Sequence, residues 1–309
     1  MNEPGEPRPE PRAPLPLRQA AEEVTARLVA AGHEALFAGG CVRDELMGLD
    51  PKDYDIATSA TPAQILAVFP RARDVGEAFG VMLVRHGGRQ FEVATFRKDG
   101  PYLDGRRPSE VHFSSRDEDA ARRDFTINGM FRDPATGELL GCREGERDIR
   151  DRLVRAIGDA HSRIAEDRLR MLRAVRFAAR FGFRIEDGTA QAIREHAPEL
   201  RAVSPERVGD EMRRMLGHAA RAEAARLVEE LGLDHAVFGA LRGTGAGRNP
   251  RVAALPPQVE WTTALAAWIV DRASGGGGGF MSVPIESRTS QCAAVRARLV
   301  LSNREADTV

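Results

Sequence analysis

The sequence has few cysteines, few aromatic residues and almost no net charge. Its three cysteines, Cys41, Cys142 and Cys292, are far apart and lack the spacing of a zinc site or a disulfide framework, so we expect a reducing, cytoplasmic compartment. No apolar run is long enough to cross a bilayer and no signal peptide is recognisable, so we expect no contact with a membrane. A formal net charge of −1 argues against a protein that coats nucleic acid through overall charge, and any such contact has to come from local patches.

Several common catalytic motifs are also missing. The sequence contains no Gly-x-x-x-x-Gly-Lys-Ser/Thr loop, no Gly-x-Ser-x-Gly turn and no His-Glu-x-x-His pair. No histidine is followed by aspartate, which argues against a phosphohydrolase of the His-Asp type. Any catalytic chemistry therefore has to come from another set of residues.

The order of the predicted elements indicates an α+β fold. A chain of 309 residues is long enough for one large domain or two to three small ones. Alternating and apolar runs predict strands near 34–38, 52–57, 81–85 and 90–96, and Gly87-Gly88 joins the last two as a hairpin. We expect these strands to form a small mixed sheet flanked by helices.

Helical signals surround and follow these strands. Helices are expected from Leu17 to Gly32 and from Thr61-Pro62 to Phe69, where threonine caps and proline occupies the first turn. Beyond about Gly158 we expect only helices. These include one capped by Ser204 that runs to Met215, and the segments 222–233 and 261–270.

Two aspartates one residue apart are the most informative pair in the chain. In a strand, the period of two places Asp53 and Asp55 on one face and Tyr54 and Ile56 on the other. Two carboxylates on one face repel each other unless a cation lies between them, and Mg²⁺ suits such a site because it prefers oxygen ligands. In a turn-rich segment such a pair is also often merely solvated. Glu92 is either a third ligand or a solvent-facing residue of its strand.

A glycine turn precedes the two aspartates. Gly39 and Gly40 end an apolar run, and Arg43 follows on a predicted short helix. Backbone N–H groups at such a turn can hold a triphosphate beside the metal, although a glycine pair is often only a tight turn. The stretch 37–58 resembles the nucleotidyltransferase signature of the class II CCA-adding enzymes and bacterial poly(A) polymerases. The resemblance implies that Gly39, Gly40 and Arg43 grip the triphosphate, while the aspartate pair at 53 and 55 is catalytic and binds Mg²⁺.

Two later segments resemble the same family. Residues 97–109 are rich in glycine, proline and basic residues, and they are either a solvated excursion or a mobile loop that closes over phosphates, as in the family. The segment from Arg122 to Met130 resembles the family's Arg-Arg-Asp-Phe-Thr-x-Asn motif. The resemblance implies that Arg123 contacts the bound nucleotide and that Asp124 holds the ribose or braces the arginine. Gly129 stands where family members more often have alanine, with no evident consequence.

Residues 166–180 predict one amphipathic helix whose arginines cover half of its surface. A row of arginines is by default a solvated face. Asp167 and Arg170, however, are three residues apart and would be neighbours on that helix, where they present an acceptor beside a fork of donors.

An acceptor beside donors complements the amino edge of two bases. Cytosine has its N4 amino group beside N3, and adenine has N6 beside N1, whereas guanine and uracil carry a carbonyl in place of the amino group. A mismatch would leave buried polar groups unpaired and would be rejected. The segment also resembles the family's base-selecting motif. The resemblance implies that Asp167 and Arg170 read the base, while Arg173 and Arg176 support the nucleotide and its phosphates.

The resemblance covers roughly residues 34–215 and implies a division of the chain into domains. After a disordered arm at 1–16, it predicts a nucleotidyltransferase head of the polymerase beta-like type at 17–158 and a helical, base-recognising neck at 159–220. A partial helical body at 221–273 and a glycine-rich, disordered tail at 274–309 would follow. The body and tail that hold tRNA in the family are usually longer than these.

The resemblance therefore implies a template-independent nucleotidyltransferase. It would add CCA, or part of it, from CTP and ATP to the tRNA 3′ end by two-metal transfer, with Mg²⁺ as cofactor and release of pyrophosphate. No obligate protein partner is evident. Two alternatives stay open: a poly(A) polymerase or a partial adder of CC or A on the same fold, and a catalytically silent protein that binds RNA or senses nucleotides.

Overall fold

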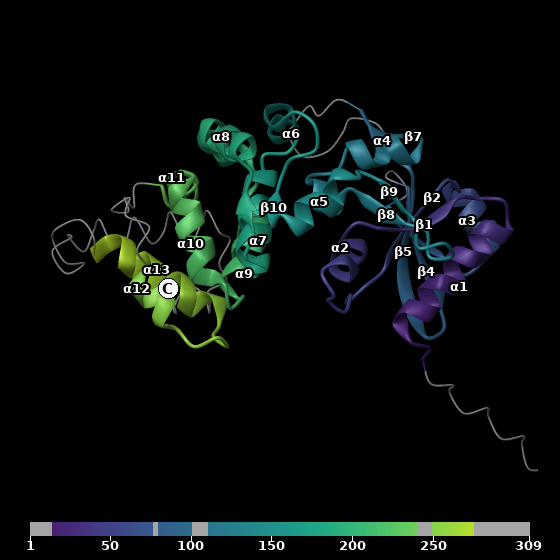
Figure 1. The fold of residues 1–309 in the computed structure, drawn as a ribbon. Coiled ribbons are helices and arrows are strands. Elements are labelled where there is room, and N and C mark those ends of the chain that lie inside the picture. Colours follow the sequence, from purple (N-terminus) through teal and green to yellow (C-terminus); the bar gives the residue numbers. More distant parts are fainter. Residues whose placement is uncertain (1–13, 77–79, 101–110, 240–248, 275–309) are drawn as a thin grey trace, which may run out of the picture. The chain divides into compact units, whose positions relative to one another are not determined.

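A computed structural model describes residues 14–76, 80–100, 111–239 and 249–274. Most of the predicted N-terminal arm, most of the loop 97–109 and nearly all of the tail 274–309 lie outside these ranges. The chain divides into two compact units, each made of three segments of the chain (Figure 1). Unit 1 comprises Met1–Lys98, Val111–Ala120 and Met130–Gly141, and unit 2 comprises Asp99–Glu110, Ala121–Gly129 and Cys142–Val309.

Unit 1 is built on a mixed seven-stranded sheet. In sheet order its strands are β3 (Arg73–Gly76), β4 (Val81–His86), β5 (Arg89–Thr95), β2 (Asp55–Thr58), β1 (Ala35–Ala38), β8 (Met130–Arg132) and β9 (Leu139–Gly141). The β2–β5 pair is parallel, and the other neighbours in this sheet are antiparallel. The four predicted strands and the mixed sheet are confirmed, whereas β3, β8 and β9 were not predicted.

The predicted hairpin between β4 and β5 has the expected turn. His86 pairs with Arg89, and the two residues between them, Gly87 and Gly88, have φ values of 55° and 74°. Two successive positive φ angles match the right-handed twist of the flanking strands and favour glycine at both positions. The hairpin therefore sets the register of β5 and, through it, the neighbours of β2.

Helices cover this sheet. The helices in this part of the chain are α1 (Leu17–Ala30), α2 (Gly40–Leu46), α3 (Pro62–Val68) and α4 (Arg116–Ala121), and β6 (Arg97–Asp99) and β7 (Val111–Phe113) form a separate short sheet. Helix α1 packs against β1, β2, β4 and β5 and buries the predicted apolar stripe, which includes Val24 and Leu28. Thr61 caps α3 as predicted, and Gln64 completes a capping box with it.

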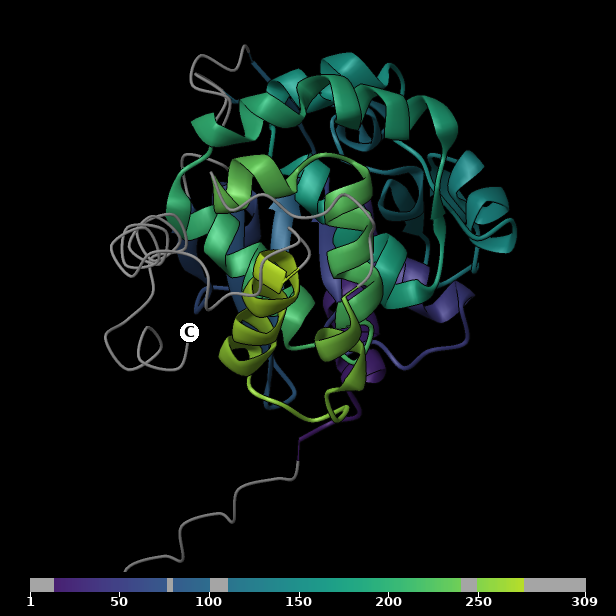
Figure 2. The same ribbon diagram turned by 90° about the vertical axis from the view of Figure 1, so that its left-hand side faces the viewer.

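Unit 2 is mainly helical. Its helices are α5 (Glu144–Arg150), α6 (Ala160–Glu166), α7 (Arg170–Phe181), α8 (Asp187–His196), α9 (Pro205–Leu216), α10 (Arg221–Glu230), α11 (Asp234–Phe238), α12 (Pro250–Ala254) and α13 (Trp261–Ser274), with 3₁₀ turns η2 (Thr126–Asn128) and η3 (Ala197–Ala202). Helices α7, α9, α10 and α13 pack together, as the green and yellow ribbons of Figure 2 show. No helix among the described residues is long and apolar enough to cross a membrane.

Three details of unit 2 differ from the predictions. The segment beyond Gly158 is not purely helical, because β11 (Arg184–Ile185) pairs in parallel with β10 (Leu153–Val154) after Gly182 ends α7 in the left-handed conformation. Ser204 occupies the N-cap position of α9, but its side chain makes no capping hydrogen bond. The predicted single helix over 166–180 is two helices, α6 and α7, which are separated at Asp167.

Gly129 has a consequence that the sequence did not reveal. It ends the η2 turn, and a Cβ atom built on it would lie 2.7 Å from Ile157 Cδ1 and 2.9 Å from Cys142 Cβ. Both distances are shorter than real Cβ contacts, and Cys142 Cβ is bonded directly to the backbone, so it cannot move aside cheaply. The sequence indicated little consequence for glycine at this position, whereas the packing leaves little room for a Cβ atom there.

Replacing Gly129 by alanine is expected to lower the free energy of unfolding by about 1–3 kcal/mol, as overpacking does in other cores. The penalty should be smaller in an Ile157→Val background, because that change removes the Cδ1 atom but leaves the contact with Cys142. Urea unfolding of the parent, both single variants and the double variant measures the coupling. A Gly129→Ala variant as stable as the parent would contradict this packing.

Candidate active site

The two aspartates lie where β2 begins. Asp55 is the first residue of the strand, and Asp53 precedes it by two residues, so the strand starts later than the predicted 52. Both aspartates are exposed, whereas Tyr54 and Ile56 are buried at 4% and 1% exposure. The predicted alternation is thus confirmed, and both carboxylates face away from the core.

Tyr54 anchors this pair in the core. Its hydroxyl donates a hydrogen bond to Glu45 Oε1 at 2.7 Å, and its ring lies 4.8 Å from that of Phe37. Burial, together with the hydrogen bond to Glu45, raises the pKa of Tyr54 above its ordinary value. Glu45 on α2 also accepts from Arg18 on α1 at 2.8 Å and pairs with Arg132 on β8 at 3.5 Å. One carboxylate therefore ties two helices and strand β8 to the residue between the aspartates.

Glu92 lies on the strand beside β2. The parallel register pairs Ile56 with Val93, so one step back along both strands places Asp55 beside Glu92, and Glu92 is exposed. Even so, the described residues include no group of three carboxylate, histidine or cysteine side chains gathered as a metal site. Among the described residues, the predicted donors for a divalent cation are the exposed aspartate pair and, as a possible third, Glu92. Two carboxylates fit Mg²⁺ well, because that ion is commonly held by one or two carboxylates, waters and substrate phosphates.

The glycine turn leads from β1 into α2. Gly39 has a φ of 68° and ψ of −114°, a conformation that favours glycine, and its N–H donates to Met130 O at 3.0 Å. Gly40 is the first residue of α2, where N–H groups have no partner within the helix. The Arg43 side chain is turned inward, with 6% exposure, and contacts Asp44 Oδ1 at 2.6 Å. Of the three residues predicted to grip a triphosphate, Gly40 is the one whose N–H lies at the start of a helix.

In unit 2, Asp124 is enclosed by donors. Its Oδ1 accepts from Phe125 N at 2.8 Å and from Asn128 Nδ2 at 3.0 Å. Its Oδ2 accepts from Arg173 Nε at 2.8 Å and from Arg173 Nη2 at 2.5 Å. These four bonds use the whole acceptor capacity of a carboxylate. Asp124 therefore braces Arg173, while the neighbouring Arg123 donates to Asn128 O at 3.3 Å.

The positive charge of Arg173 helps to keep the Asp124 carboxylate deprotonated. Burial by itself would raise the pKa of Asp124, but the Arg173 charge and the hydrogen bonds from Asn128, Arg173 and Phe125 together hold that pKa below its ordinary value. Asp124 in turn raises the pKa of Arg173. The pair is therefore ionised, and it joins the segment before η2 to helix α7.

Asp167 lies between two helices rather than on one. It ends α6 with φ −143° and ψ 102°, and its Oδ1 accepts from Leu169 N at 3.1 Å at the start of α7. A short acidic side chain that bonds the next backbone amides is a common helix-starting arrangement, and it breaks the predicted continuous helix. Arg207 of α9 donates to both carboxylate oxygens of Asp167, at 3.1 and 2.7 Å.

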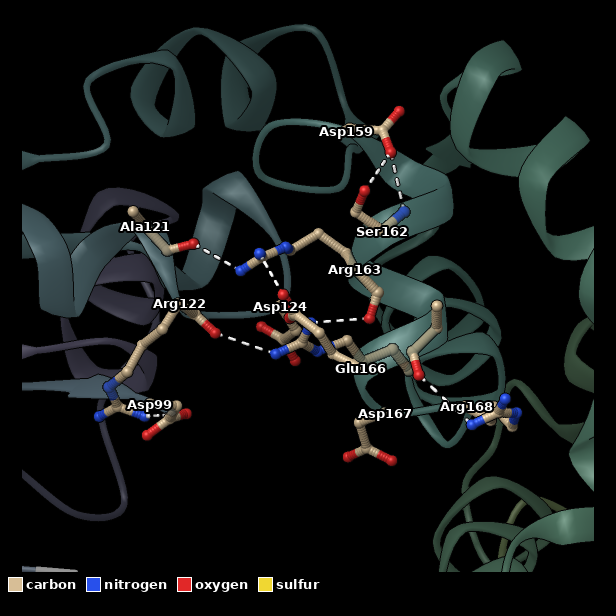
Figure 3. A network of polar contacts seen from close by, with 12 residues as sticks. Asp99, Ala121, Arg122, Asp124, Asp159, Ser162, Arg163, Glu166, Asp167 and Arg168 are labelled. Atoms are coloured by element: carbon tan, nitrogen blue, oxygen red, sulfur yellow. Dashed lines mark hydrogen bonds and ion pairs between the residues drawn. The ribbon is translucent and has the colours of Figure 1, made fainter. Parts of the chain in front are cut away.

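Arg170 belongs to a clamp that sequence reasoning missed. Figure 3 shows two other members of this group, Arg163 and Glu166. Glu166 binds Arg163 through one oxygen and Arg170 Nη1 through the other, the latter at 2.7 Å. Arg163 Nη1 donates to Ala121 O at 3.0 Å, and Arg170 Nη2 donates to Arg122 O at 2.9 Å. These three side chains, the 163–166–170 clamp, hold the backbone immediately before Arg123 and Asp124. Arg163 had no motif signal, because its partner is a main-chain carbonyl.

Arg176 is also turned inward. Its Nε donates to Glu211 Oε2 of α9 at 2.6 Å, and its guanidinium carbon lies 4.3 Å from the centre of the Phe177 ring. The two charged side chains are 11% and 4% exposed, and burial lowers the pKa of Arg176 below its ordinary value. Positions 170, 173 and 176 therefore do not form the solvated row that is the default for such a pattern, because each has an acidic partner from another segment.

The Glu45–Tyr54 contact predicts a coupled loss of stability. Tyr54→Phe removes a hydrogen bond to a charged acceptor and should lower the free energy of unfolding by about 1.5–3 kcal/mol. Glu45→Ala should cost more, because it leaves the Tyr54 hydroxyl without its acceptor and also removes the ion-pair partner of Arg18 and Arg132. Urea unfolding of both variants and their double variant gives the coupling energy. Glu22→Ala is the control, since Glu22 also pairs with Arg18 but is exposed. Additive effects of the two changes would contradict the contact.

The Asp124–Arg173 pair predicts an acid-sensitive contribution to stability. At neutral pH, Asp124→Asn leaves Arg173 without its counter-charge and should cost about 3–5 kcal/mol. Because folding lowers the pKa of Asp124, the stabilisation is present above the unfolded-state pKa and is lost as the pH falls through the folded-state pKa. The difference between parent and variant should therefore narrow below about pH 4, where an unfolded aspartate binds its proton. Urea unfolding from pH 7 to pH 3 measures it, and a constant difference would contradict the assignment.

Two known domain families match the sequence. The poly A polymerase head domain matches residues 35–155, and the domain described as a probable RNA and SrmB-binding site of polymerase A matches residues 182–242. The first match contains the glycine turn, the aspartate pair and the Asp124 segment. The second includes helix α9 and therefore Arg207.

Two of the similar curated proteins are CCA-adding enzymes. The chain is 45% identical over 204 residues to the CCA-adding enzyme of Geobacillus stearothermophilus, a match that covers 66% of this chain and 50% of the relative. It is 39% identical over 259 residues to the CCA-adding enzyme of Lactiplantibacillus plantarum, covering 82% of this chain and 63% of that protein. The chain thus spans about half the length of the first of these relatives.

Solved structures of CCA-adding enzymes are also similar to this chain. The CCA-adding enzyme of Bacillus stearothermophilus, crystallised in complex with CTP, superposes with a TM-score of 0.77 at 34% identity, over 95% of this chain and 68% of that one. The Thermotoga maritima CCA-adding enzyme, complexed with tRNA, shares the fold with a TM-score of 0.70 at 20% identity, over 94% of this chain and 67% of that one. With its head-domain motifs, its mixed sheet and this degree of identity, the chain belongs to the family of CCA-adding enzymes and poly(A) polymerases.

Proposed function

We propose that the chain is a template-independent nucleotidyltransferase that adds C and A from CTP and ATP to the 3′ end of tRNA. The observation that carries this proposal is the exposed aspartate pair at the start of β2, anchored through Tyr54 beside the glycine turn. The likeness to a CCA-adding enzyme crystallised with CTP supports CTP as a substrate. The tRNA complex of a more distant relative of the same fold makes tRNA the partner to test first.

In this proposal the aspartate pair binds divalent metal, and specifically Mg²⁺. When bound, such ions supply Lewis-acid activation of the RNA 3′-hydroxyl and neutralisation of the leaving pyrophosphate. Asp53 and Asp55 contribute the oxygen ligands, and Tyr54 with Glu45 holds them in place. The 3′-oxygen forms its bond to the α-phosphorus as the bond from that phosphorus to pyrophosphate breaks. Most of the acceleration then comes from positioning and charge neutralisation.

The nucleotide is gripped and read by the other groups. The glycine turn at 39–40 receives the triphosphate, with the Gly40 N–H at the start of α2 as a donor, and Arg43 and Arg123 contribute positive charge. Asp167 and Arg170 read the amino edge of cytosine or adenine. Arg173 and Arg176 act from helix α7, where Asp124 and Glu211 fix their positions.

The domain boundaries and the compartment belong to the same proposal. The head, neck and partial body at 17–158, 159–220 and 221–273 remain predictions, as does a cytoplasmic location. A poly(A) polymerase, or a partial adder of CC or A, is the second candidate, and the match to the poly A polymerase head domain favours keeping it. A catalytically silent RNA-binding protein is the less favoured third candidate, because both aspartates are retained and exposed.

Incorporation of labelled nucleotides tests the proposal. The purified chain, given Mg²⁺ and tRNA that lacks its terminal CCA, should incorporate label from CTP and then from ATP, and should stop after one to three additions. Asp55→Ala should lower the incorporation rate at least about a hundredfold, because it removes a ligand of the metal ion that would neutralise the leaving pyrophosphate. It should leave part of the nucleotide binding intact.

Asp50→Ala is the matched control, because Asp50 is an exposed carboxylate of the same segment that lies outside β2. It should incorporate label at the parent rate. A long product of A alone on arbitrary RNA would favour the polymerase. If the parent incorporates neither nucleotide, or if Asp55→Ala is as active as the parent, the assignment is wrong.

A further inference from the structure

Asp167, the predicted acceptor for the base, is not held in place by a helix. It lies in extended conformation between α6 and α7. Its N–H bonds back to Arg163 O at 3.4 Å and its carbonyl accepts from Arg170 N at 3.0 Å, so main-chain bonds hold its backbone but leave its carboxylate to other partners. Its side chain is 17% exposed, and Figure 3 draws no contact from it to Arg163 or Glu166. Its direction is therefore set by the groups that bond to its two oxygens.

Among the described residues, one side chain contacts both oxygens. Arg207 Nη1 donates to Oδ1 at 3.1 Å, and Arg207 Nη2 donates to Oδ2 at 2.7 Å. A two-pronged bond between guanidinium and carboxylate fixes the plane of the carboxylate as well as its position. Arg207 is itself placed by the first turn of α9, where its N–H bonds to Ser204 O at 3.1 Å and Pro205 begins the helix.

The bonds to Asp167 leave one part of the carboxylate available. Oδ1 already accepts from Leu169 N and from Arg207, which uses its two lone-pair positions, whereas within the described part of the chain Oδ2 accepts from Arg207 alone. The remaining acceptor position is therefore on Oδ2, in a direction set by Arg207. An amino group of an incoming base can donate there, but a carbonyl oxygen cannot.

We propose that Arg207 is a positioning residue that determines base specificity by aiming Asp167. This inference rests on the proposed function, and it adds a residue that lies 40 positions from Asp167 in the sequence. Rejection of a carbonyl base requires an acceptor that cannot turn away. With Arg207 present, uracil and guanine meet a fixed acceptor; without it, Asp167 can rotate and the mismatch is relieved. Loss of Arg207 therefore relaxes the choice of base more than it slows addition of the correct one.

Competition between nucleotides tests this role. With CTP against UTP, and ATP against GTP, Arg207→Gln should lose at least about tenfold in discrimination, the equivalent of one hydrogen bond. Arg207→Lys should be intermediate, because it keeps a charge but not the two-pronged geometry. Arg213→Gln is the control on the same helix, since Arg213 pairs with Asp210, and it should discriminate like the parent.

A second measurement does not require catalysis. Equilibrium titration of the parent and the Arg207 variants with CTP and UTP, with thermal unfolding to verify folding, should show the CTP preference falling by a similar factor in Arg207→Gln. Parent-level discrimination in a folded Arg207→Gln, or a parent that binds CTP and UTP equally, would overturn the role of Arg207. A parent that prefers CTP in binding but incorporates no nucleotide would instead overturn the proposed function.

Discussion

The Glu166 carboxylate, held between two arginines, is the contact on which the arrangement of unit 2 depends. Through Arg163 and Arg170 it fixes the main-chain carbonyls of Ala121 and Arg122. Those residues are the first of unit 2 after the chain leaves unit 1 at Ala120. A carbonyl can be held in this way whatever side chain it carries, so the clamp sets the path of the backbone and leaves the next two side chains, Arg123 and Asp124, to interact elsewhere.

Helix α7 makes further ion pairs of this kind along its length. Its arginines at 170, 173 and 176 each bind an acid from a different segment: Glu166 of α6, Asp124 before η2 and Glu211 of α9. Buried ion pairs contribute little net stability compared with apolar packing, because both charges lose their hydration. They are costly to break singly, however, and they have one preferred geometry. Three such pairs on one helix therefore serve chiefly to position segments that are distant in sequence. Arg207 of α9 likewise positions Asp167, to which it is bound through both carboxylate oxygens.

The features that could be predicted from the sequence are those that depend on residues close to one another in the chain. The β4–β5 hairpin, the capping of α3 and the alternation around Asp55 depend on neighbours within a few residues, and all three are confirmed. Strands β8 and β9 are only three residues long and exist through pairing with β1 and with each other, so no local pattern marks them. The break at Asp167 was hidden because the apolar period continues across it. The need for glycine at position 129 could not be predicted, because it depends on the close packing of Ile157 and Cys142, which lie farther along the chain.

A crystal structure of the chain with CTP and Mg²⁺ is the most direct test of the account. The account predicts that cytosine N4 lies within hydrogen-bonding distance of Asp167 Oδ2, with Arg207 still bound to the same carboxylate and N3 facing donors of Arg170. A cytosine whose amino edge faces neither residue, or an Asp167 that has exchanged Arg207 for another partner, would contradict it.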